Sequence, residues 1–262
     1  MWKKYSLARG YLHYWLHAVN EHSLHAPFVY RLYCDIIKHD LYHSSFAPLE
    51  ALRQSFLRNR ASVPIKNLGA PSLVSSHPQR TVRSLARHSL SSPKFSRLLY
   101  RLAVDQSSDY IVELGTSLGI NALYLSLARP SAQIYTLEGV DSVADLAEPM
   151  FQHPPHTNVR LIRGGIDQTL PGLLAQLPRV DLAYVDANHH YEPTVRYFEQ
   201  LLTKIYEDSI IIIDDIYWSD EMQRAWQHIK QHPAVSLSLD LFDAGIVFFL
   251  PLEVRQTYTL MF

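Results

Sequence analysis

The chain has 262 residues, of which 47% are hydrophobic and 19% are charged. This length and composition suit one compact globular domain with a sizeable extension, and two full domains would be cramped. No stretch approaches the roughly 18 consecutive apolar residues of a membrane span, and the N-terminus leads into no signal-like apolar core, so we expect a cytoplasmic protein. Cys34 is the single cysteine, which excludes an internal disulfide and any multi-cysteine metal site.

The net charge of −1 hides an uneven distribution. Residues 1–105 hold 15 Lys and Arg against 5 Asp and Glu, whereas the rest of the chain holds 9 against 20. Two explanations stay open. The two halves face one another within one fold, or the acidic half holds a cation while the basic half meets an acidic partner.

The first hundred residues predict helices, which lie near residues 5–19, 26–39, 46–58 and 80–103. We interpret residues 1–105 as a helical cap or lid, with the Pro-, Ser- and Gly-containing stretch at 63–78 as its flexible segment. Leu12, Trp15 and Leu16 belong to one apolar face of the first helix. We expect this face to pack against the protein's own core or a second copy of the chain, in preference to a membrane.

From residue 106 onward, short aliphatic runs alternate with amphipathic helical stretches. This alternation predicts a Rossmann-like, doubly wound α/β sheet over residues 106–262. The final runs, 236–242 and 245–250, are joined by so short a link that they must form an antiparallel hairpin. The expected strands are 110–114, 133–137, 159–162, 181–185 and 209–213, and the expected helices are 118–128, 141–152, 168–177, 192–206 and 219–231.

The most informative stretch is Glu113-Leu-Gly115-Thr-Ser117-Leu-Gly119, which joins the first of these strands to a helix. Its glycines let the backbone approach a ligand closely, but their spacing is not the G-x-G-x-x-G of a dinucleotide fold. Glu113, expected to point outward near the strand end, would repel a phosphate and attract a cation.

The same residues match the G-x-S-x-G elbow of α/β-hydrolases, with Ser117 as nucleophile. We disfavour that alternative, because its triad needs a histidine beyond the last strands and none follows His232.

This stretch resembles motif I of class I S-adenosylmethionine-dependent methyltransferases, in which an acid and a G-x-x-x-G loop follow the first strand. Glu138, at the end of the next strand, stands where that family places an acid on both ribose hydroxyls. The third strand leads into Gly164-Gly-Ile166-Asp167, where relatives often carry Gly-Asp-Ala facing adenine. Glycine stands at the usual acidic position here, so the adenine contact stays open between Asp167, the backbone and neither. The resemblance implies that the S-adenosylmethionine site includes Glu113, Gly115, Ser117, Gly119, Glu138, Gly139, Ile166 and Asp186.

Acidic residues also follow the fourth and fifth strands, as Asp186 and as the pair Asp214-Asp215. Because adjacent parallel strands end at one edge of a sheet, these carboxylates would repel one another unless a positive charge lay among them. A hard divalent cation with oxygen ligands, Mg²⁺ or a similar ion, is the natural candidate. The pattern resembles metal-dependent O-methyltransferases of the catechol, caffeoyl-CoA and macrolide-sugar types, which implies Asp186, Asp214 and Asp215 as metal ligands.

The same resemblance implies methyl transfer to a hydroxyl of a small acceptor held by the metal. His189 stands where the catechol-type enzymes carry a lysine base, and an imidazole suits that task; His190 and Asp186 stay open as the base. Asp186-Ala-Asn-His189 does not resemble the motif of enzymes that methylate base amines, which argues against methylation of adenine or cytosine. We do not expect a nucleic-acid partner, although the basic first half keeps a nucleic-acid substrate open. The basic first half keeps an anionic acceptor open. A homodimer, a metal-independent methyltransferase and a donor-binding protein without turnover also remain open.

Overall fold

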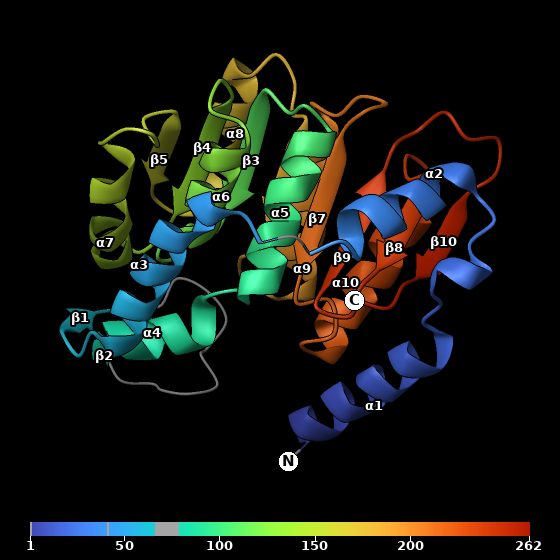
Figure 1. Ribbon diagram of the computed structural model, residues 1–262, viewed down its shortest axis with the longest axis horizontal. Coiled ribbons are helices and arrows are strands. Elements are labelled where there is room, and N and C mark those ends of the chain that lie inside the picture. Colours follow the sequence, from blue (N-terminus) through green and yellow to red (C-terminus); the bar gives the residue numbers. More distant parts are fainter. Residues whose placement is uncertain (1, 41, 66–78) are drawn as a thin grey trace. The chain divides into compact units, whose positions relative to one another are not determined.

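The computed structural model describes residues 2–40, 42–65 and 79–262, and the side chains of residues 2–6 lie outside this description. The chain divides into two compact units. Unit 1 consists of Met1–His39 and Leu177–Phe262, and unit 2 consists of Asp40–Gln176. Both units are built from strands covered by helices (Figure 1).

Unit 2 is built on three parallel strands in the order β3-β4-β5. The strands are β3 (Tyr110–Leu114), β4 (Gln133–Glu138) and β5 (Val159–Arg163), and the helices that follow them are α6 (Ile120–Ala128), α7 (Asp141–Phe151) and α8 (Ile166–Gln176). The side chains of Ile111, Val112 and Leu114 are all fully buried. β3 is therefore covered on both faces, which is typical of a strand inside a parallel sheet.

The part of unit 2 that precedes this sheet contains helices and one short hairpin. Its elements are a 3-10 turn (Ser44–Phe46), α3 (Ala47–Arg58), β1 (Ser62–Pro64), β2 (Gln79–Thr81), α4 (Val82–Ser89) and α5 (Pro93–Asp105). The antiparallel pair β1–β2 was not predicted, since strands of three residues show no recognisable periodicity. The single helix expected over 80–103 is two helices, because Ser92 caps a new helix that begins at Pro93. Residues 66–78 of the predicted flexible segment lie outside the described residues.

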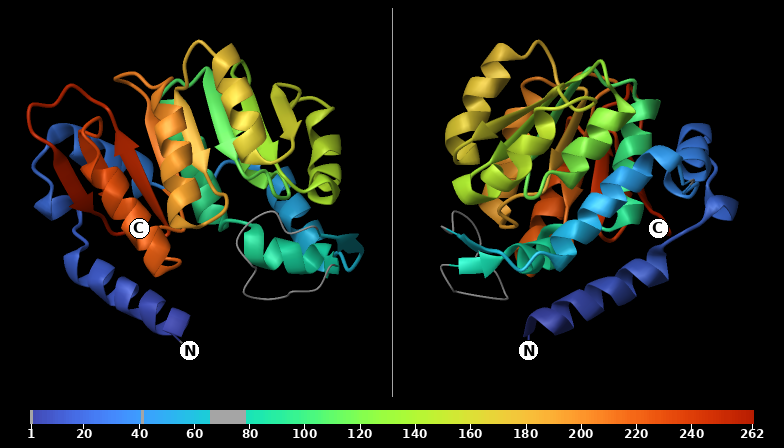
Figure 2. Two further views of the ribbon diagram at one scale, coloured as in Figure 1. Left: turned by 180° about the vertical axis from the view of Figure 1, so that it is seen from behind. Right: turned by 60° about the vertical axis from the view of Figure 1, so that its left-hand side comes forward.

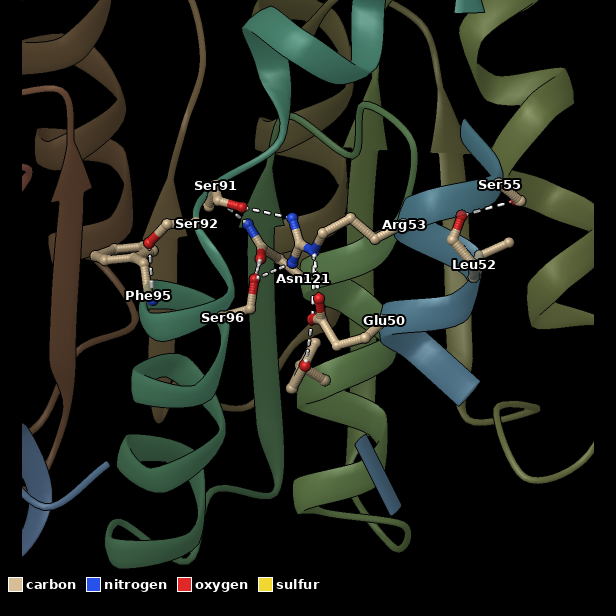
Figure 3. Close-up of polar contacts among 10 residues, drawn as sticks. Glu50, Leu52, Arg53, Ser55, Ser91, Ser92, Phe95, Ser96 and Asn121 are labelled. Atoms are coloured by element: carbon tan, nitrogen blue, oxygen red, sulfur yellow. Dashed lines mark hydrogen bonds and ion pairs between the residues drawn. The ribbon is translucent and has the colours of Figure 1, made fainter. Parts of the chain in front are cut away.

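A buried arginine ties α3 to α5 and α6 (Figure 3). The Arg53 side chain donates to the Ser91 carbonyl at 2.5 Å, to Ser96 Oγ at 2.9 Å and to Glu50 Oε1 at 3.2 Å. Ser96 Oγ in turn donates to Asn121 Oδ1 at 2.7 Å. Since Asn121 lies in the first turn of α6, this network fixes α3 and α5 to the helix that follows the loop with Gly115 and Gly119, which we call the glycine loop.

Unit 1 holds five strands in the order β10-β8-β9-β7-β6. β6 and β7 pair parallel, and β9 pairs antiparallel with both β7 and β8. The edge strand β10 was not predicted, because its residues are mostly polar. The helices α9 and α10 pack side by side against these strands (Figure 2). The bounds are β6 (Leu182–Val185), α9 (Tyr191–Leu202), β7 (Ile210–Asp214), α10 (Asp220–Gln231), β8 (Leu237–Asp240), β9 (Ala244–Phe248) and β10 (Gln256–Thr259).

The N-terminal helices also belong to unit 1. They are α1 (Trp2–His17), a 3-10 turn (Glu21–Ser23), and α2 (Pro27–Arg31), which continues as a π-helix over Leu32–Ile37. The Tyr14 hydroxyl anchors α1 by donating to the Leu260 carbonyl at 2.7 Å. The expected packing of the apolar face against the protein's own core is wrong, because Leu12, Trp15 and Leu16 are 56%, 59% and 63% exposed. The side of the helix that carries Tyr14 is the one that packs.

The predicted fold class is confirmed. Strands β3, β4 and β5 of unit 2 pair parallel. In unit 1 the antiparallel strand is β9, the second strand of the predicted C-terminal hairpin. Within the residues that the structure describes, no helix is long and apolar enough to cross a membrane.

Candidate functional site

The loop after β3 has a backbone that few residue types tolerate. Gly115, Ser117 and Gly119 have φ angles of +103°, +50° and +75°, all in the left-handed region. Gly119 caps the N-terminus of α6, and a Cβ atom there would lie 2.9 Å from Cζ of Phe151 in α7. Gly119 is therefore required by its φ angle and by the close packing of α7, independently of any ligand.

Glu138, at the end of β4, holds this loop from the side. Its Oε2 accepts a hydrogen bond from the Ser117 N–H at 2.9 Å, and its Oε1 accepts one from the Val140 N–H at 2.9 Å. Burial raises the pKa of Glu138, and the N–H groups of Val140, Ser117 and Gly139 oppose that rise. Because a carboxylate offers about four acceptor positions, it can still receive the two hydroxyls of a ribose.

Glu113 does not point outward as the sequence suggested. The residue is 1% exposed, since β3 is buried on both faces. Its Oε2 accepts a hydrogen bond from Thr136 Oγ1 at 2.6 Å, and its Oε1 is buried without a hydrogen-bond partner in the described part of the chain. Burial raises the pKa of Glu113 to about 8 against the opposing Thr136 hydrogen bond, and the charge of Glu138 adds to the rise. This carboxyl is therefore mostly protonated at neutral pH.

Two residues that the sequence analysis missed support the loop. Thr136 Oγ1 lies 2.6 Å from Thr116 Oγ1 as well as from Glu113, and Ser89 Oγ, at the end of α4, lies 2.7 Å from Ser117 Oγ. Thr136 was open to prediction, because it pairs with Glu113 across the parallel strands. No sequence signal pointed to Ser89. Among the described residues the Ser117 hydroxyl contacts this serine, and not the histidine that a hydrolase would need.

The remaining predicted residues of unit 2 follow β4 and β5. Gly139 directly follows Glu138, and Ile166 begins α8. The Gly164 N–H, at a φ of +123°, donates to the Glu138 carbonyl at 2.9 Å and so joins the loops after β4 and β5. Unit 2 thus carries seven predicted residues at the ends of three neighbouring strands and just after them, namely Glu113, Gly115, Ser117, Gly119, Glu138, Gly139 and Ile166.

Unit 1 carries the second predicted group, at the ends of β6 and β7. The buried Tyr184 hydroxyl donates to Asp214 Oδ2 at 2.6 Å and lies 3.2 Å from Asp186 Oδ2. Burial raises the pKa of Asp214 well above its ordinary value, and the charges of Asp186 and Asp215 add to the rise. One hydroxyl proton cannot serve both carboxylates at once, so the group needs a further proton or positive charge. Tyr184 was missed, although it shares a strand face with Asp186.

His189 lies among these acids. Its Nε2 is 3.6 Å from Asp186 Oδ1, and its Nδ1 is 3.8 Å from Asp215 Oδ2. His189 and Asp215 have φ angles of +44° and +55°, so both side chains are presented by strained backbone. His190 instead places its Nδ1 3.0 Å from Glu221 Oε2 at the start of α10. The structure therefore brings His189, and not His190, to the predicted acids.

The donor chemistry of Asp186, Asp214 and Asp215 fits a hard cation, because all their ligand atoms are carboxylate oxygens and their charges repel. Over residues 2–40, 42–65 and 79–262, however, no three His, Cys, Asp or Glu side chains are gathered as a ready metal site. His189 supplies a positive charge beside Asp186 and Asp215 when it is protonated.

Known proteins share this architecture. The profile of a family described as "Methyltransferase domain" matches residues 112–216, from β3 to the loop after β7. No curated protein matches the chain in sequence.

Three solved structures illustrate the likeness, which at these identities concerns the fold. A methyltransferase of Podospora anserina, PaMTH1, bound to SAH, is 17% identical with a TM-score of 0.60, over 86% of this chain and 97% of that one. An O-methyltransferase of Bacillus cereus in complex with SAH is 17% identical with a TM-score of 0.57, over 87% and 98%. The O-methyltransferase TomG of Streptomyces achromogenes, in complex with SAM, is 18% identical with a TM-score of 0.53, over 62% and 82%.

Proposed function

We propose that this chain transfers the methyl group of S-adenosylmethionine to a hydroxyl of a small acceptor, and the methyltransferase-domain profile that matches residues 112–216 supports methyl transfer. The observation that carries the proposal is the position of Glu138 against the amides of Ser117 and Val140, with acceptor capacity left for a ribose. The Bacillus cereus and Streptomyces achromogenes proteins, both described as O-methyltransferases, support a hydroxyl as the acceptor.

In this proposal unit 2 binds the donor. Glu138 accepts the ribose hydroxyls, and the glycine loop provides room for the backbone to approach the ligand. The donor's ammonium group lies at Glu113, whose Oε1 is buried without a described partner. Burial raises the pKa of Glu113 to about 8, so the carboxyl is mostly protonated before the donor binds. The positive charge of the ammonium group then lowers this pKa, and the carboxyl ionises.

Unit 1 then supplies the acceptor chemistry. Asp186, Asp214 and Asp215 would hold a divalent cation, Mg²⁺ being the ion that their oxygen ligands suit. When bound, such a cation lowers the pKa of an acceptor hydroxyl. His189 takes the hydroxyl proton as general base, and Asp186, 3.6 Å from its Nε2, orients the ring and stabilises the imidazolium. The mutual repulsion that raises the pKa of Asp214 supports this assignment.

A metal-independent methyltransferase is the second candidate, and the position of His189 favours it. The imidazole ring faces Asp186 and Asp215 with both nitrogens, so these two carboxylates stabilise the imidazolium that forms when the ring takes up a proton, without a metal ion. In that case the neutral imidazole of His189 takes the proton of the acceptor hydroxyl by itself.

Calorimetry and a turnover assay test these proposals. We expect S-adenosylmethionine to bind the full chain, and S-adenosylhomocysteine to form with at least one member of a panel of catechol-type and sugar hydroxyl acceptors. No donor binding would overturn the function. EDTA treatment followed by Mg²⁺ addition decides between the candidates, since turnover that survives EDTA rules out the cation.

We also propose a homodimer, formed through α1, in a reducing cytoplasmic setting. Support for the dimer comes from the exposed Leu12, Trp15 and Leu16, which form an apolar surface on one helix. Light scattering of the Trp15→Ser variant tests it: we expect a dimer for the unchanged chain and a monomer for the variant.

A further inference from the structure

The basic segment of unit 2 contains arginines in two different situations. Residues 51–104 hold ten Lys and Arg and no Asp or Glu. Three of these arginines are paired inside the fold. Arg97 donates through Nε and Nη2 to the two carboxylate oxygens of Asp40, at 2.7 and 2.6 Å. Arg101 donates to the same carboxylate at 2.9 Å. Arg53 donates to Glu50, Ser91 and Ser96, as described above.

Arg80 and Arg83 lack such partners. Nε and Nη2 of Arg80, and Nε of Arg83, are buried without a hydrogen-bond partner in the described part of the chain. Burial lowers the pKa of Arg80, and no carboxylate opposes this effect. Nε and Nη2 form the edge of the guanidinium with which Arg97 binds Asp40. The carboxylate-binding edge of Arg80 is therefore shielded from water and has no acceptor among the described residues.

The acids of the neighbouring helix α7 do not serve these arginines. Glu148 and Asp145 bind Arg163, at 2.6 and 2.8 Å. Guanidinium nitrogens that are buried without an anion are unfavourable, because they lose contact with water and gain no acceptor in exchange. An anion from outside the chain would remove that cost.

Arg80 and Arg83 lie on a segment that is attached near the loops after β3 and β4, which we call the donor loops because we propose that they bind S-adenosylmethionine. Pro64 on β1 accepts a hydrogen bond from the Ser142 hydroxyl, just after the loop that follows β4. Ser89 at the other end of α4 contacts Ser117, in the loop that follows β3. Arg80 on β2 and Arg83 at the start of α4 lie between these two attachments, since β2 pairs with β1 and leads directly into α4 (Figure 1).

We propose that Arg80 and Arg83 bind a carboxylate or phosphate group, and that this group belongs to the methyl acceptor. The site is built from the Nε–Nη2 edge of Arg80 and Nε of Arg83, and it lies in unit 2 on the segment fixed to the donor loops. The second half of the proposal rests on the methyltransferase function, whereas the first half stands on the arginines alone. The acceptor is then a small hydroxylated molecule that also carries an acidic group.

The test measures the unfolding midpoint of the full chain against increasing inorganic phosphate, and separately against acetate, with sodium chloride holding the ionic strength constant. A bound anion raises the midpoint in a saturable way. The variants are Arg80→Gln, Arg83→Gln and Arg80→Lys, and the matched control is Arg58→Gln, which removes an exposed arginine of α3.

We expect the midpoint to saturate with at least one of the two anions. The half-saturating concentration of that anion should be at least tenfold higher in Arg80→Gln and in Arg83→Gln, and intermediate in Arg80→Lys. In Arg58→Gln it should stay within twofold of the value for the unchanged chain. Saturation by phosphate but not acetate identifies a phosphate site, and the reverse identifies a carboxylate site. A rise that does not saturate, no rise, or equal responses of Arg80→Gln and Arg58→Gln overturns the site. If Arg80→Gln does not fold, Arg83→Gln and Arg80→Lys decide the same question.

A second titration, at saturating S-adenosylmethionine, assigns the anion. We expect the half-saturating anion concentration to stay the same or fall, because donor and acceptor bind together. Competition between the anion and S-adenosylmethionine would mean that the arginines bind the donor's own carboxylate, which overturns the acceptor assignment. A chain that binds phosphate through Arg80 but does not bind S-adenosylmethionine would refute the proposed function and leave the anion site intact.

Discussion

The acidic groups of the two units are stabilised by different means. In unit 2 the two oxygens of Glu138 accept hydrogen bonds from the backbone of Ser117 and Val140, donors that the fold itself supplies. In unit 1 Asp214 relies on one Tyr184 hydroxyl, which also lies near Asp186. Burial raises the pKa of Glu138 and of Asp214, but like charges add to the rise at Asp214 alone. The fold therefore supplies the hydrogen bonds that stabilise Glu138, whereas the acids of unit 1 need a proton, an imidazolium or a cation to offset their charges.

The largest effect is expected from Asp214→Asn. The amide oxygen still accepts from Tyr184, but the negative charge is lost, so we expect turnover to fall by about 10²–10³-fold. S-adenosylmethionine affinity stays within twofold, and the unfolding midpoint stays the same or rises because repulsion is relieved. Turnover and calorimetry measure these changes.

Asp240→Asn is the control for that variant. Asp240 is also a strand-end acid of unit 1, but it is buried and accepts hydrogen bonds from Tyr217 and Trp226. We expect it to lose about 1–2 kcal/mol of stability and to keep its turnover per folded molecule. Equal turnover losses in the two variants would contradict a special role for Asp214.

Glu138→Gln tests the other side of the comparison. The variant loses a charge-assisted acceptor of hydroxyl and amide donors, so we expect the Kd for S-adenosylmethionine to rise by about 10–100-fold. Glu148→Gln, which changes an acid of α7 paired with Arg163, is expected to leave the Kd unchanged. Calorimetry at neutral pH separates the two variants, and an unchanged Kd in Glu138→Gln would refute the donor assignment.

The buried Glu113 predicts a pH dependence. Its pKa is about 8 in the folded chain against an ordinary value of 4.5, so between these values the folded state holds one proton more than the unfolded state. The free energy of unfolding therefore falls as pH rises through this window, by about 1.4 kcal/mol per pH unit from this group, and the fall ends above pH 8. Glu113→Gln removes this contribution. Denaturant unfolding at pH 6, 7 and 8 compares the slopes, and equal slopes in the two proteins would contradict the burial argument.

The smallest effect concerns the glycines. Gly119→Ala places a Cβ atom 2.9 Å from Phe151 at a φ of +75°, and we expect it to cost at least about 1 kcal/mol of stability. Gly172→Ala in α8 meets no atom within 4 Å and has no positive φ, so we expect it to stabilise the chain by about 0.4–1 kcal/mol. Thermal unfolding of both variants checks the opposite signs. A stabilising Gly119→Ala would mean that the loop does not need its left-handed backbone.

The sequence by itself determined the α/β class, most of the strands and the edge positions of the acids. The β-branched run Ile210 to Ile213 predicts a buried strand, and parallel pairing of β6 with β7 follows from the alternation with helices. These features depend on local periodicity and on short connections, which a linear sequence records directly. The same is true of the glycine loop, whose residue types require a tight turn.

Only the tertiary structure decided how each charged side chain is compensated. Arg97 and Arg80 are equivalent in the sequence, yet Arg97 meets Asp40 across 57 positions while both Nε and Nη2 of Arg80 lack a partner among the described residues. Glu113 belongs to a motif that suggested an exposed acid, and burial of both faces of β3 made it a mostly protonated one. Desolvation and pairing depend on atoms that are distant in sequence and close in space, so residue spacing cannot predict them.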